Sequence, residues 1–288
     1  MANTIQLKRR IKTAQNVSKT TKAMQLIAAS KLKRAQEAAV SSRPYVEKLE
    51  SLSKRLSALK QENFTHPYIE QSLTSSKTLL IVLSPDKGLC GGLITNLLRE
   101  YLSFNNDTNI LTTTVGKKIE IVASRSKNEL IASFPFGTTL PQFRNIFPIL
   151  KIIDEYYLSK KVNSVKILYS RFASFFSQVP TVSTILPLIL PEKINEQQID
   201  LNVSELFEPS IEEILPALFK HYVEMSLYHF LLENYVSEQA ARMLAMQNAT
   251  DNARDIIIGL TLEYNKARQE KITNEILDIS SSSAFVYE

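Results

Sequence analysis

The chain contains 288 residues, of which 44% are hydrophobic and 22% charged, a composition typical of a soluble globular protein of one to two domains. The formal net charge of +5 is modest, but the basic residues are unevenly distributed. Because Cys90 is the only cysteine, an internal disulfide and a cysteine-based metal cluster are excluded. The first residues are polar and basic without an apolar signal core, so we expect a cytoplasmic protein.

Residues 3–59 are predicted to form one long helix, because helix formers dominate and neither Pro nor Gly occurs before Pro44. Small and apolar residues recur along it at alternating spacings of three and four, which is typical of a helix-pairing seam. These residues are Ala14, Val17, Thr21, Met24, Ala28, Leu32 and Ala35. The segment is therefore predicted to be one helix of a coiled coil.

The same segment is strongly basic, with Glu37 as its only acidic residue before residue 40. Its cationic residues are Lys8, Arg9, Arg10, Lys12, Lys19, Lys22, Lys31, Lys33 and Arg34. Nucleic acid is one candidate partner, but the charges surround the helix and no aromatic residue precedes Tyr45. An acidic protein surface is equally suitable, and these residues alone do not decide between the two.

Strand-like and helix-like patterns alternate in the middle of the chain, which predicts a small α/β domain at residues 75–192. Thr78–Leu83 is a short, continuous apolar run of the kind found in buried parallel strands. Further strands are predicted at 109–115, 129–134, 162–169 and 179–188, and helices at 93–104 and 141–158.

The loop Ser84–Gly92 lies between a predicted strand and a predicted helix, where backbone N–H groups can bind a phosphate. Its glycines do not have the spacing of a dinucleotide or P-loop motif, so a tight structural turn is favoured. The three histidines, His66, His221 and His229, lack metal-ligand spacing. We therefore predict no catalytic, cofactor-binding or metal site.

Residues 210–279 are predicted to form a second helix, on the order of 100 Å long at 1.5 Å per residue. Ser210 and Glu213 have the spacing of a capping box, and Pro216 is close enough to the start to be tolerated. From Ile214 to Val236 the helix is apolar on most of its circumference, which predicts burial against a globular body. Charged interruptions argue against a membrane span.

Beyond Ser237 the large side chains of this second helix give way to a row of alanines four residues apart. The row contains Ala241, Ala245, Ala249 and Ala253. Because the two small-residue seams lie at opposite ends of the sequence, we predict that the helices pair antiparallel. The predicted organisation is thus an N-terminal helix (1–60), the α/β domain and a C-terminal helix (208–288).

Three separated blocks of the sequence resemble the gamma subunit of F-type ATP synthases, of the bacterial type. The first block combines Lys8-Arg-Arg-Ile11, Thr21-Lys-Ala-Met24 and Ala28-Ala-Ser-Lys-Leu32. The second is Ser84-Pro-Asp-Lys-Gly-Leu-Cys-Gly-Gly92. The third begins at Glu238-Gln-Ala-Ala-Arg-Met243 and continues through Tyr264-Asn265, Arg268-Gln269, Ile272-Thr273 and Glu275-Ile276. Pro85 and Ile94 depart from the family pattern of the second block.

The resemblance implies a long antiparallel coiled coil with a small Rossmann-like α/β domain, an architecture of the α/β or α+β class. It also implies a non-catalytic rotary stalk that couples transmembrane ion flow to ATP synthesis or hydrolysis at the beta subunits. The implied partners are the hexamer of alpha and beta subunits, the epsilon subunit and the membrane c-ring, without nucleic acid, cofactor or a membrane span of its own. The implied location is the cytoplasmic face of the bacterial membrane.

Residue by residue, the resemblance implies contacts with the beta subunits. These involve Lys8, Arg9, Arg10, Lys22, Arg242, Arg268, Gln269, Thr273 and Glu275. The surface near residues 42–47 and 206–210, where both long helices reach the α/β domain, is predicted to contact the ring and epsilon.

Overall fold

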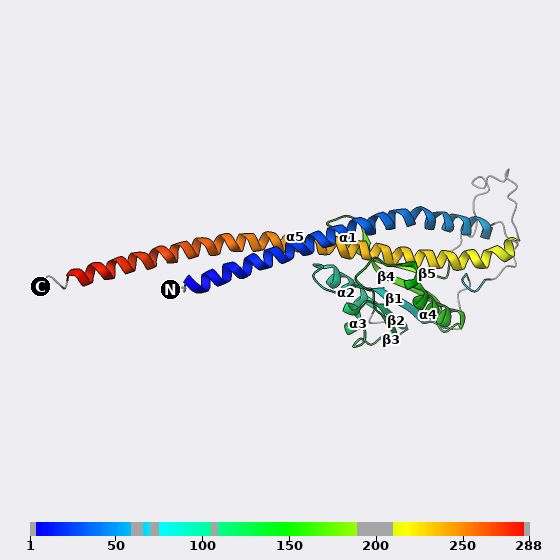
Figure 1. Cartoon of the computed structure of the whole chain (residues 1–288). Coiled ribbons are helices and arrows are strands. Elements are labelled where there is room, and N and C mark those ends of the chain that lie inside the picture. Colours follow the sequence, from blue (N-terminus) through cyan, green and yellow to red (C-terminus); the bar gives the residue numbers. More distant parts are fainter. Residues whose placement is uncertain (1–3, 59–65, 70–74, 105–108, 189–209, 285–288) are drawn as a thin grey trace. The chain divides into compact units, whose positions relative to one another are not determined.

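A computed structural model of the protein describes residues 4–58, 66–69, 75–104, 109–188 and 210–284 (Figure 1). The chain divides into two compact units, each of which contains part of both long helices. The first unit comprises residues 1–28 and 242–288, and the second comprises residues 29–241.

The elements of secondary structure follow one another in the order expected for two long helices that enclose an α/β domain. They are α1 (Thr4–Ala58), β1 (Thr78–Leu83), α2 (Leu93–Ser103), β2 (Ile110–Val115), α3 (Lys117–Ala123), β3 (Glu129–Phe134), the 3-10 helix η2 (Phe143–Ile146), α4 (Phe147–Leu158), β4 (Ser164–Phe172), β5 (Gln178–Leu186) and α5 (Ile211–Ala284). This confirms the predicted fold class.

The sheet of the second unit has the strand order β3-β2-β1-β4-β5 (Figure 1). β1 pairs in parallel with β2 on one side and β4 on the other, whereas β5 is an antiparallel edge strand. Side chains of successive strand residues point to opposite faces. Leu79, Leu80, Ile81 and Val82 are all fully buried, so both faces of β1 are covered. This explains why β1 reads as an unbroken apolar run in the sequence.

One face of the sheet packs against α2 and α3. Leu80 and Val82 of β1 belong to the same buried cluster as Leu97 of α2 and Ile119 of α3. Ala241 of α5 also belongs to this cluster, so the core includes part of the long C-terminal helix. Cys90 lies in the same cluster with 1% of its surface exposed, as expected for a buried thiol.

The part of α5 in the second unit is buried against the α/β domain, as predicted from its nearly continuous apolar surface. Phe219, Leu227 and Tyr235 expose at most 1% of their surface. The ring of Phe230 packs against that of Tyr169 of β4 with a centroid distance of 4.8 Å and a tilt of 44°. Asn234 Oδ1 accepts a hydrogen bond from the Ser170 backbone N–H. In the described part of the chain, no helix has an apolar stretch sufficient for a membrane span.

Some elements differ from the sequence-based predictions. The predicted helix at 141–158 begins as η2 and becomes α-helical only at Phe147, while β4 continues to Phe172. The short helix α3 was not predicted at all. Its apolar residues Ile119, Ile121 and Ala123 alternate with period two, so a strand is as compatible with this segment as a helix.

Candidate functional site

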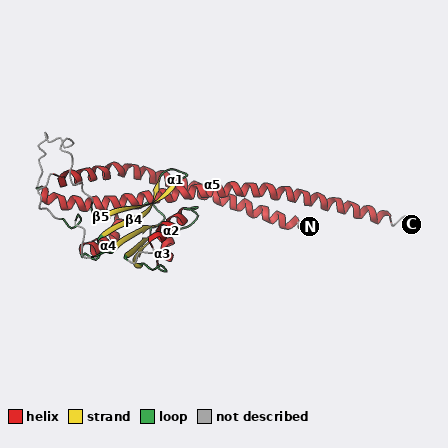
Figure 2. Cartoon of the chain, turned by 180° about the vertical axis from the view of Figure 1, so that it is seen from behind, coloured by secondary structure: helices red, strands yellow, loops and turns green. Residues whose placement is uncertain are grey.

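In both units α1 and α5 lie side by side and antiparallel (Figures 1 and 2). In the first unit the hydroxyls of Thr21 and Thr250 are 2.8 Å apart. In the second unit Ser42 Oγ lies 3.0 Å from His229 Nδ1, and Tyr45 Oη lies 2.8 Å from His221 Nε2. The residue number rises along α1 while that of its partner on α5 falls, which is the signature of antiparallel pairing.

The seam of α1 follows an uninterrupted heptad pattern. Nine residues, spaced alternately by four and three, are less exposed than the residues around them over most of this length. They are Leu7, Ile11, Ala14, Ser18, Thr21, Gln25, Ala28, Leu32 and Ala35. On α5 in the first unit, the matching residues are Met246, Thr250, Ala253, Ile257, Leu260, Tyr264 and Ala267. Among the alanines predicted for this seam, Ala241 and Ala253 are buried, while Ala245 and Ala249 are partly exposed.

Val17 and Met24, which were also predicted for the seam, remain 48% and 39% exposed. The adjacent Ser18 and Gln25 occupy the heptad positions instead. A small or polar side chain at these places lets the helices approach closely, and it leaves the larger apolar side chains on the outside of the pair.

The outer surface of the first unit is unusually apolar for a two-helix coil. Its exposed large hydrophobic residues are Ile5, Val17, Met24, Leu26, Ile27, Ile256, Ile258, Leu262, Ile272, Ile276 and Leu277. Leu262, for example, exposes 67% of its surface. Isolated exposed apolar side chains are normal, but a surface covered with them indicates contact with other proteins. Sequence analysis did not predict this feature, and it assigned two of these residues, Val17 and Met24, to the seam.

Basic side chains lie beside these apolar residues. Lys8, Arg9 and Arg10 are exposed and form no ion pair with the described residues. Arg9 and Arg10 also line a groove of about 530 Å³ between the two helices, together with Val17 and Ile256. Lys22 is exposed and donates a hydrogen bond to Gln25 Oε1. The groove therefore combines an apolar floor with positive charge at its edge.

Among the described residues, the end of α5 has no partner helix, because the register of the Thr21 and Thr250 pair brings Thr4, where α1 begins, to the level of Ala267. Every residue from Arg268 to Asp278 is exposed. Arg268, Gln269, Thr273 and Glu275, which the resemblance places in contact with beta subunits, all lie here. The Thr273 hydroxyl donates to the Gln269 backbone carbonyl, and Glu275 forms an exposed ion pair with Lys271. Arg242 is partly buried at the other end of this unit.

The surface predicted to contact the ring and epsilon is only partly described. Residues 206–209 lie outside the described residues. Ser42 contacts His229 as stated above, and the exposed Arg43 forms an ion pair with Glu47 at 3.5 Å. Lys31, one of the basic residues of α1, donates to the Thr138 carbonyl oxygen at 2.6 Å. That lysine therefore binds the α/β domain within its own unit.

The loop Ser84–Gly92 is organised by the carboxylate of Asp86. Asp86 Oδ1 accepts hydrogen bonds from the backbone N–H groups of Lys117 and Phe136, and Oδ2 accepts one from Gly137. The hydroxyl of Ser84 accepts a further bond from the Ile119 N–H group at 3.4 Å. The start of α3 is thereby capped by two side chains of this loop.

These contacts fill the place where a doubly wound sheet usually binds phosphate, which is the loop region at the carboxyl ends of the parallel strands. At this edge the Asp86 carboxylate accepts the backbone N–H groups of Lys117, Phe136 and Gly137. Gly116 has a φ of 109°, and a Cβ there would lie 1.9 Å from the Ser84 carbonyl oxygen, so the turn requires glycine. In the described chain, no cluster of three His, Cys, Asp or Glu side chains could hold a metal.

Comparison with known proteins identifies the family. A family model described as ATP synthase matches residues 3–285. The ATP synthase gamma chain of Dehalococcoides mccartyi is 39% identical over 287 residues, which make up 99% of each chain. The chain belongs to the ATP synthase gamma chain family. The gamma chain of Methylacidiphilum infernorum is 38% identical over 292 residues and 98% of each chain. These gamma chains are bacterial, as the resemblance implied.

Solved structures agree with this assignment to the gamma chain family. A chain in the central stalk and c-ring of the Tetrahymena thermophila mitochondrial ATP synthase is 25% identical, with a TM-score of 0.58. That match covers 80% of this chain and 99% of the other. A chain of the Euglena gracilis mitochondrial ATP synthase in rotational state 3 has a TM-score of 0.65, with 98% and 95% coverage. At 18% identity, the second match shows the shared fold.

Proposed function

We propose that this gamma chain is the central rotary stalk of a bacterial F-type ATP synthase. It couples the rotation driven by transmembrane ion flow to ATP synthesis or hydrolysis at the beta subunits. The observation that carries the proposal is the outer surface of the first unit, where apolar side chains of both helices are exposed beside basic ones. Membership of the gamma chain family supports the ATP synthase complex as its surroundings, and within that complex we propose that this surface meets the alpha and beta hexamer.

A stalk of this kind acts by differential contact. The two helices present different side chains around their circumference, with the Arg9 and Arg10 groove on one side and residues such as Leu262 elsewhere. Each orientation therefore contacts a given beta subunit differently. A contact that stabilises one beta conformation more than another shifts the population of conformations, and this converts rotation into a change of nucleotide affinity.

The charged side chains contribute many weak contacts to this coupling. Lys8, Arg9, Arg10 and Lys22 are expected to meet acidic loops of the beta subunits. Exposed ion pairs are worth about 0.2–1 kcal/mol each, so no single one is expected to be essential. Contacts of this strength form and break as the stalk turns without holding it in one orientation.

The α/β domain is proposed to form the base of the stalk and to contact epsilon and the c-ring. The protein would lie peripherally at the cytoplasmic face of the membrane. Bond chemistry belongs to the beta subunits in this proposal.

The contacts with beta are tested by a triple alanine variant at Arg242, Gln269 and Thr273. We expect the complex to assemble, but ATP hydrolysis to slow or to become uncoupled from proton pumping. Both activities are measured in the same membranes, so that their ratio reports coupling independently of the amount of complex.

The matched control replaces Thr261, Glu263 and Glu270, which are exposed residues of the same helix that the resemblance does not place at beta. Thr261 and Thr273 are comparable, because each hydroxyl donates to the carbonyl four residues earlier. Equal rates and an equal pumping ratio in the two triple variants and the parent would contradict the proposed contacts.

A further inference from the structure

A cavity of about 310 Å³ lies in the second unit, at the carboxyl ends of β2 and β3. Val115 and Phe134, the last residues of these two strands, line it together with Ile149 of α4 and Leu231 of α5. Liquid water occupies about 30 Å³ per molecule, so this space corresponds to roughly ten waters, or to a ligand of about ten non-hydrogen atoms. Open α/β sheets bind ligands outside the carboxyl ends of their strands, so the position is suited to a binding site.

Most of the lining is apolar. Its buried residues are Val115, Phe136, Pro141, Ile149 and Leu231. Pro135 and Pro148 also line the cavity and are exposed to solvent. The cavity therefore has a buried apolar part and a part that solvent can reach.

The polar side chains of the lining offer hydrogen-bond donors. Arg144 is exposed and forms no ion pair with the described residues. Asn145 Oδ1 accepts the backbone N–H of Gln142 at 3.0 Å, and its NH2 group makes no hydrogen bond within the described chain. A guanidinium has donors only, and the acceptor of the amide is already in use. The polar end of the cavity thus lacks an acceptor as a partner for its donors.

One carboxylate lies near this cavity. Asp86 accepts the backbone N–H groups of Phe136 and Gly137, and Phe136 also lines the cavity. Asp86 itself is not among the lining residues, and both of its oxygens accept backbone donors. Its charge reduces the attraction for an anion, but it does not occupy the donors of Arg144 and Asn145.

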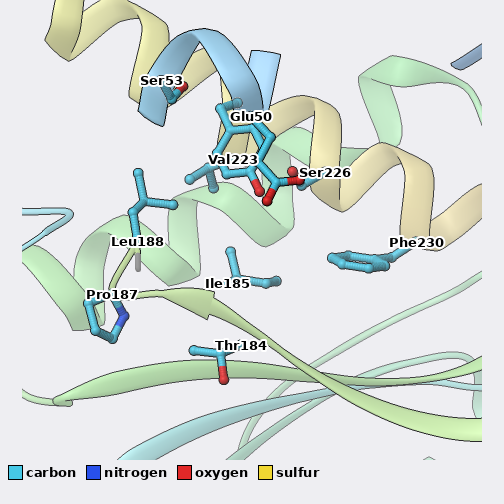
Figure 3. A pocket seen from close by; sticks show the side chains of 10 residues that line it. Glu50, Ser53, Thr184, Ile185, Pro187, Leu188, Val223, Ser226 and Phe230 are labelled. Atoms are coloured by element: carbon cyan, nitrogen blue, oxygen red, sulfur yellow. The ribbon is translucent and has the colours of Figure 1, made fainter. Parts of the chain in front are cut away.

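A second cavity of the same unit, of about 260 Å³, provides a comparison within the molecule (Figure 3). Ile185 and Val223 supply apolar wall, but the described lining contains the carboxylate of Glu50 and no cationic side chain. The charge of Glu50 acts on the hydroxyl of Tyr222, which also hydrogen-bonds with Ser226. The two cavities are therefore similar in size and in apolar character but differ in the sign of their charge.

We propose that the cavity at the carboxyl ends of β2 and β3 binds a small organic carboxylate with an apolar body. The carboxylate would lie against Arg144 and the NH2 group of Asn145, and the apolar body against Phe136, Ile149 and Leu231. A guanidinium can donate two parallel hydrogen bonds to a carboxylate, whereas a ligand cation would meet only donors. The proposed rotary function does not require this site, so the two can be tested separately.

The probe is phenylacetate, with phenylacetamide and phenethylammonium as neutral and cationic comparators of similar size. Binding to the full-length chain is measured by calorimetry and by chemical shifts of the Val115, Ile149 and Leu231 methyl groups. We expect saturable binding of phenylacetate, with the amide weaker by about tenfold and no binding of the ammonium ion. The methyl groups of Ile185 and Val223, in the comparison cavity, should not shift.

Two variants locate the carboxylate of the ligand. Arg144→Gln removes the charge and is expected to weaken phenylacetate binding by about tenfold. Asn145→Asp keeps an acceptor for the Gln142 N–H but replaces the NH2 donor with a negatively charged oxygen, so it should weaken binding at least as much. Both residues are exposed, so neither substitution removes a core side chain.

Arg125→Gln is the matched control. This exposed arginine follows α3, forms no ion pair with the described residues and does not line the cavity. The substitution changes the net charge by the same amount as Arg144→Gln and should leave phenylacetate binding unchanged.

Four results would overturn the proposal. The absence of saturable binding would show a cavity that holds only water. Equal affinities for phenylacetate and phenylacetamide would remove the role of charge. Equal shifts of the Ile185 and Val223 methyl groups would show unspecific uptake into apolar cavities. Equal weakening by Arg144→Gln and Arg125→Gln would show general attraction by the positive charge of the protein.

Discussion

Asp86 organises the carboxyl edge of the sheet, although its three hydrogen-bond donors lie far from it in the sequence. One donor is at the start of α3, and the other two follow β3. Asp86 is half-buried, and its removal leaves partly buried donors without this acceptor, which is more costly than the loss of the bond itself. The acidic side chain thus substitutes for the ligand that this type of loop could otherwise bind.

Asp86→Ala is expected to lower the free energy of unfolding by about 1–3 kcal/mol, because backbone donors lose their charged acceptor. Urea unfolding of the full chain, followed by circular dichroism, measures the change. Glu155→Ala, an exposed carboxylate on α4, is the control and should change stability little. If the two variants had the same free energy of unfolding, water would replace the Asp86 carboxylate as hydrogen-bond acceptor without loss of stability.

At the residue scale, the sequence favoured a structural turn at this loop but did not indicate the contacts of Asp86. The glycine spacing argued against phosphate motifs, and this required only the order of the residues. The role of Asp86 could not be predicted, because its donors are brought together by the parallel pairing of β1, β2 and β3. Cys90 was predictable as a buried thiol, since it lies between a buried strand and an amphipathic helix.

At the scale of elements, the clearest predictions came from segments whose burial is uniform. β1 was predicted with its observed bounds because both of its faces are covered. The seam of α1 was harder to predict, since Val17 and Met24 are more hydrophobic than Ser18 and Gln25. Hydrophobicity alone selects the former pair, whereas the close approach of α5 places the latter pair inside.

Overpacking of the seam tests its position. Ala28 is 1% exposed, and Ala28→Phe should destabilise the helix pair by about 1–3 kcal/mol. Ala23→Phe, on the exposed side of the same helix, makes the same chemical change outside the seam. The two variants are compared by thermal unfolding of the full chain. If Ala23→Phe lost more stability than Ala28→Phe, the seam would lie on the Ala23 face of α1, and the assignment made here would be wrong.

For the whole molecule, the proposed function requires that α1 and α5 turn together. The Thr21 and Thr250 hydroxyls are 2.8 Å apart, so cysteines at both positions have the proximity that a disulfide needs. In a Cys90→Ala background, oxidation of the double-cysteine complex should cross-link the two helices and leave most of its ATP hydrolysis intact. A complex with Thr21→Cys alone, oxidised in the same way, controls for damage by the oxidant.

Hydrolysis that stops on oxidation of the double-cysteine complex and returns on reduction would show that the helices slide past one another during the cycle. The same pair of measurements reports the register, because a shift of one heptad separates the two cysteines by a full repeat and prevents the cross-link.

The unpartnered end of α5 has a mechanical consequence. Up to Ala267 a twisting load is carried by two helices that are bound along a heptad seam, and from Arg268 onward it is carried by one. A single filament resists torsion and bending less than two filaments fastened together. Under load, elastic deformation should therefore concentrate in residues 268–278. This end of α5 should twist before the two-helix segment does.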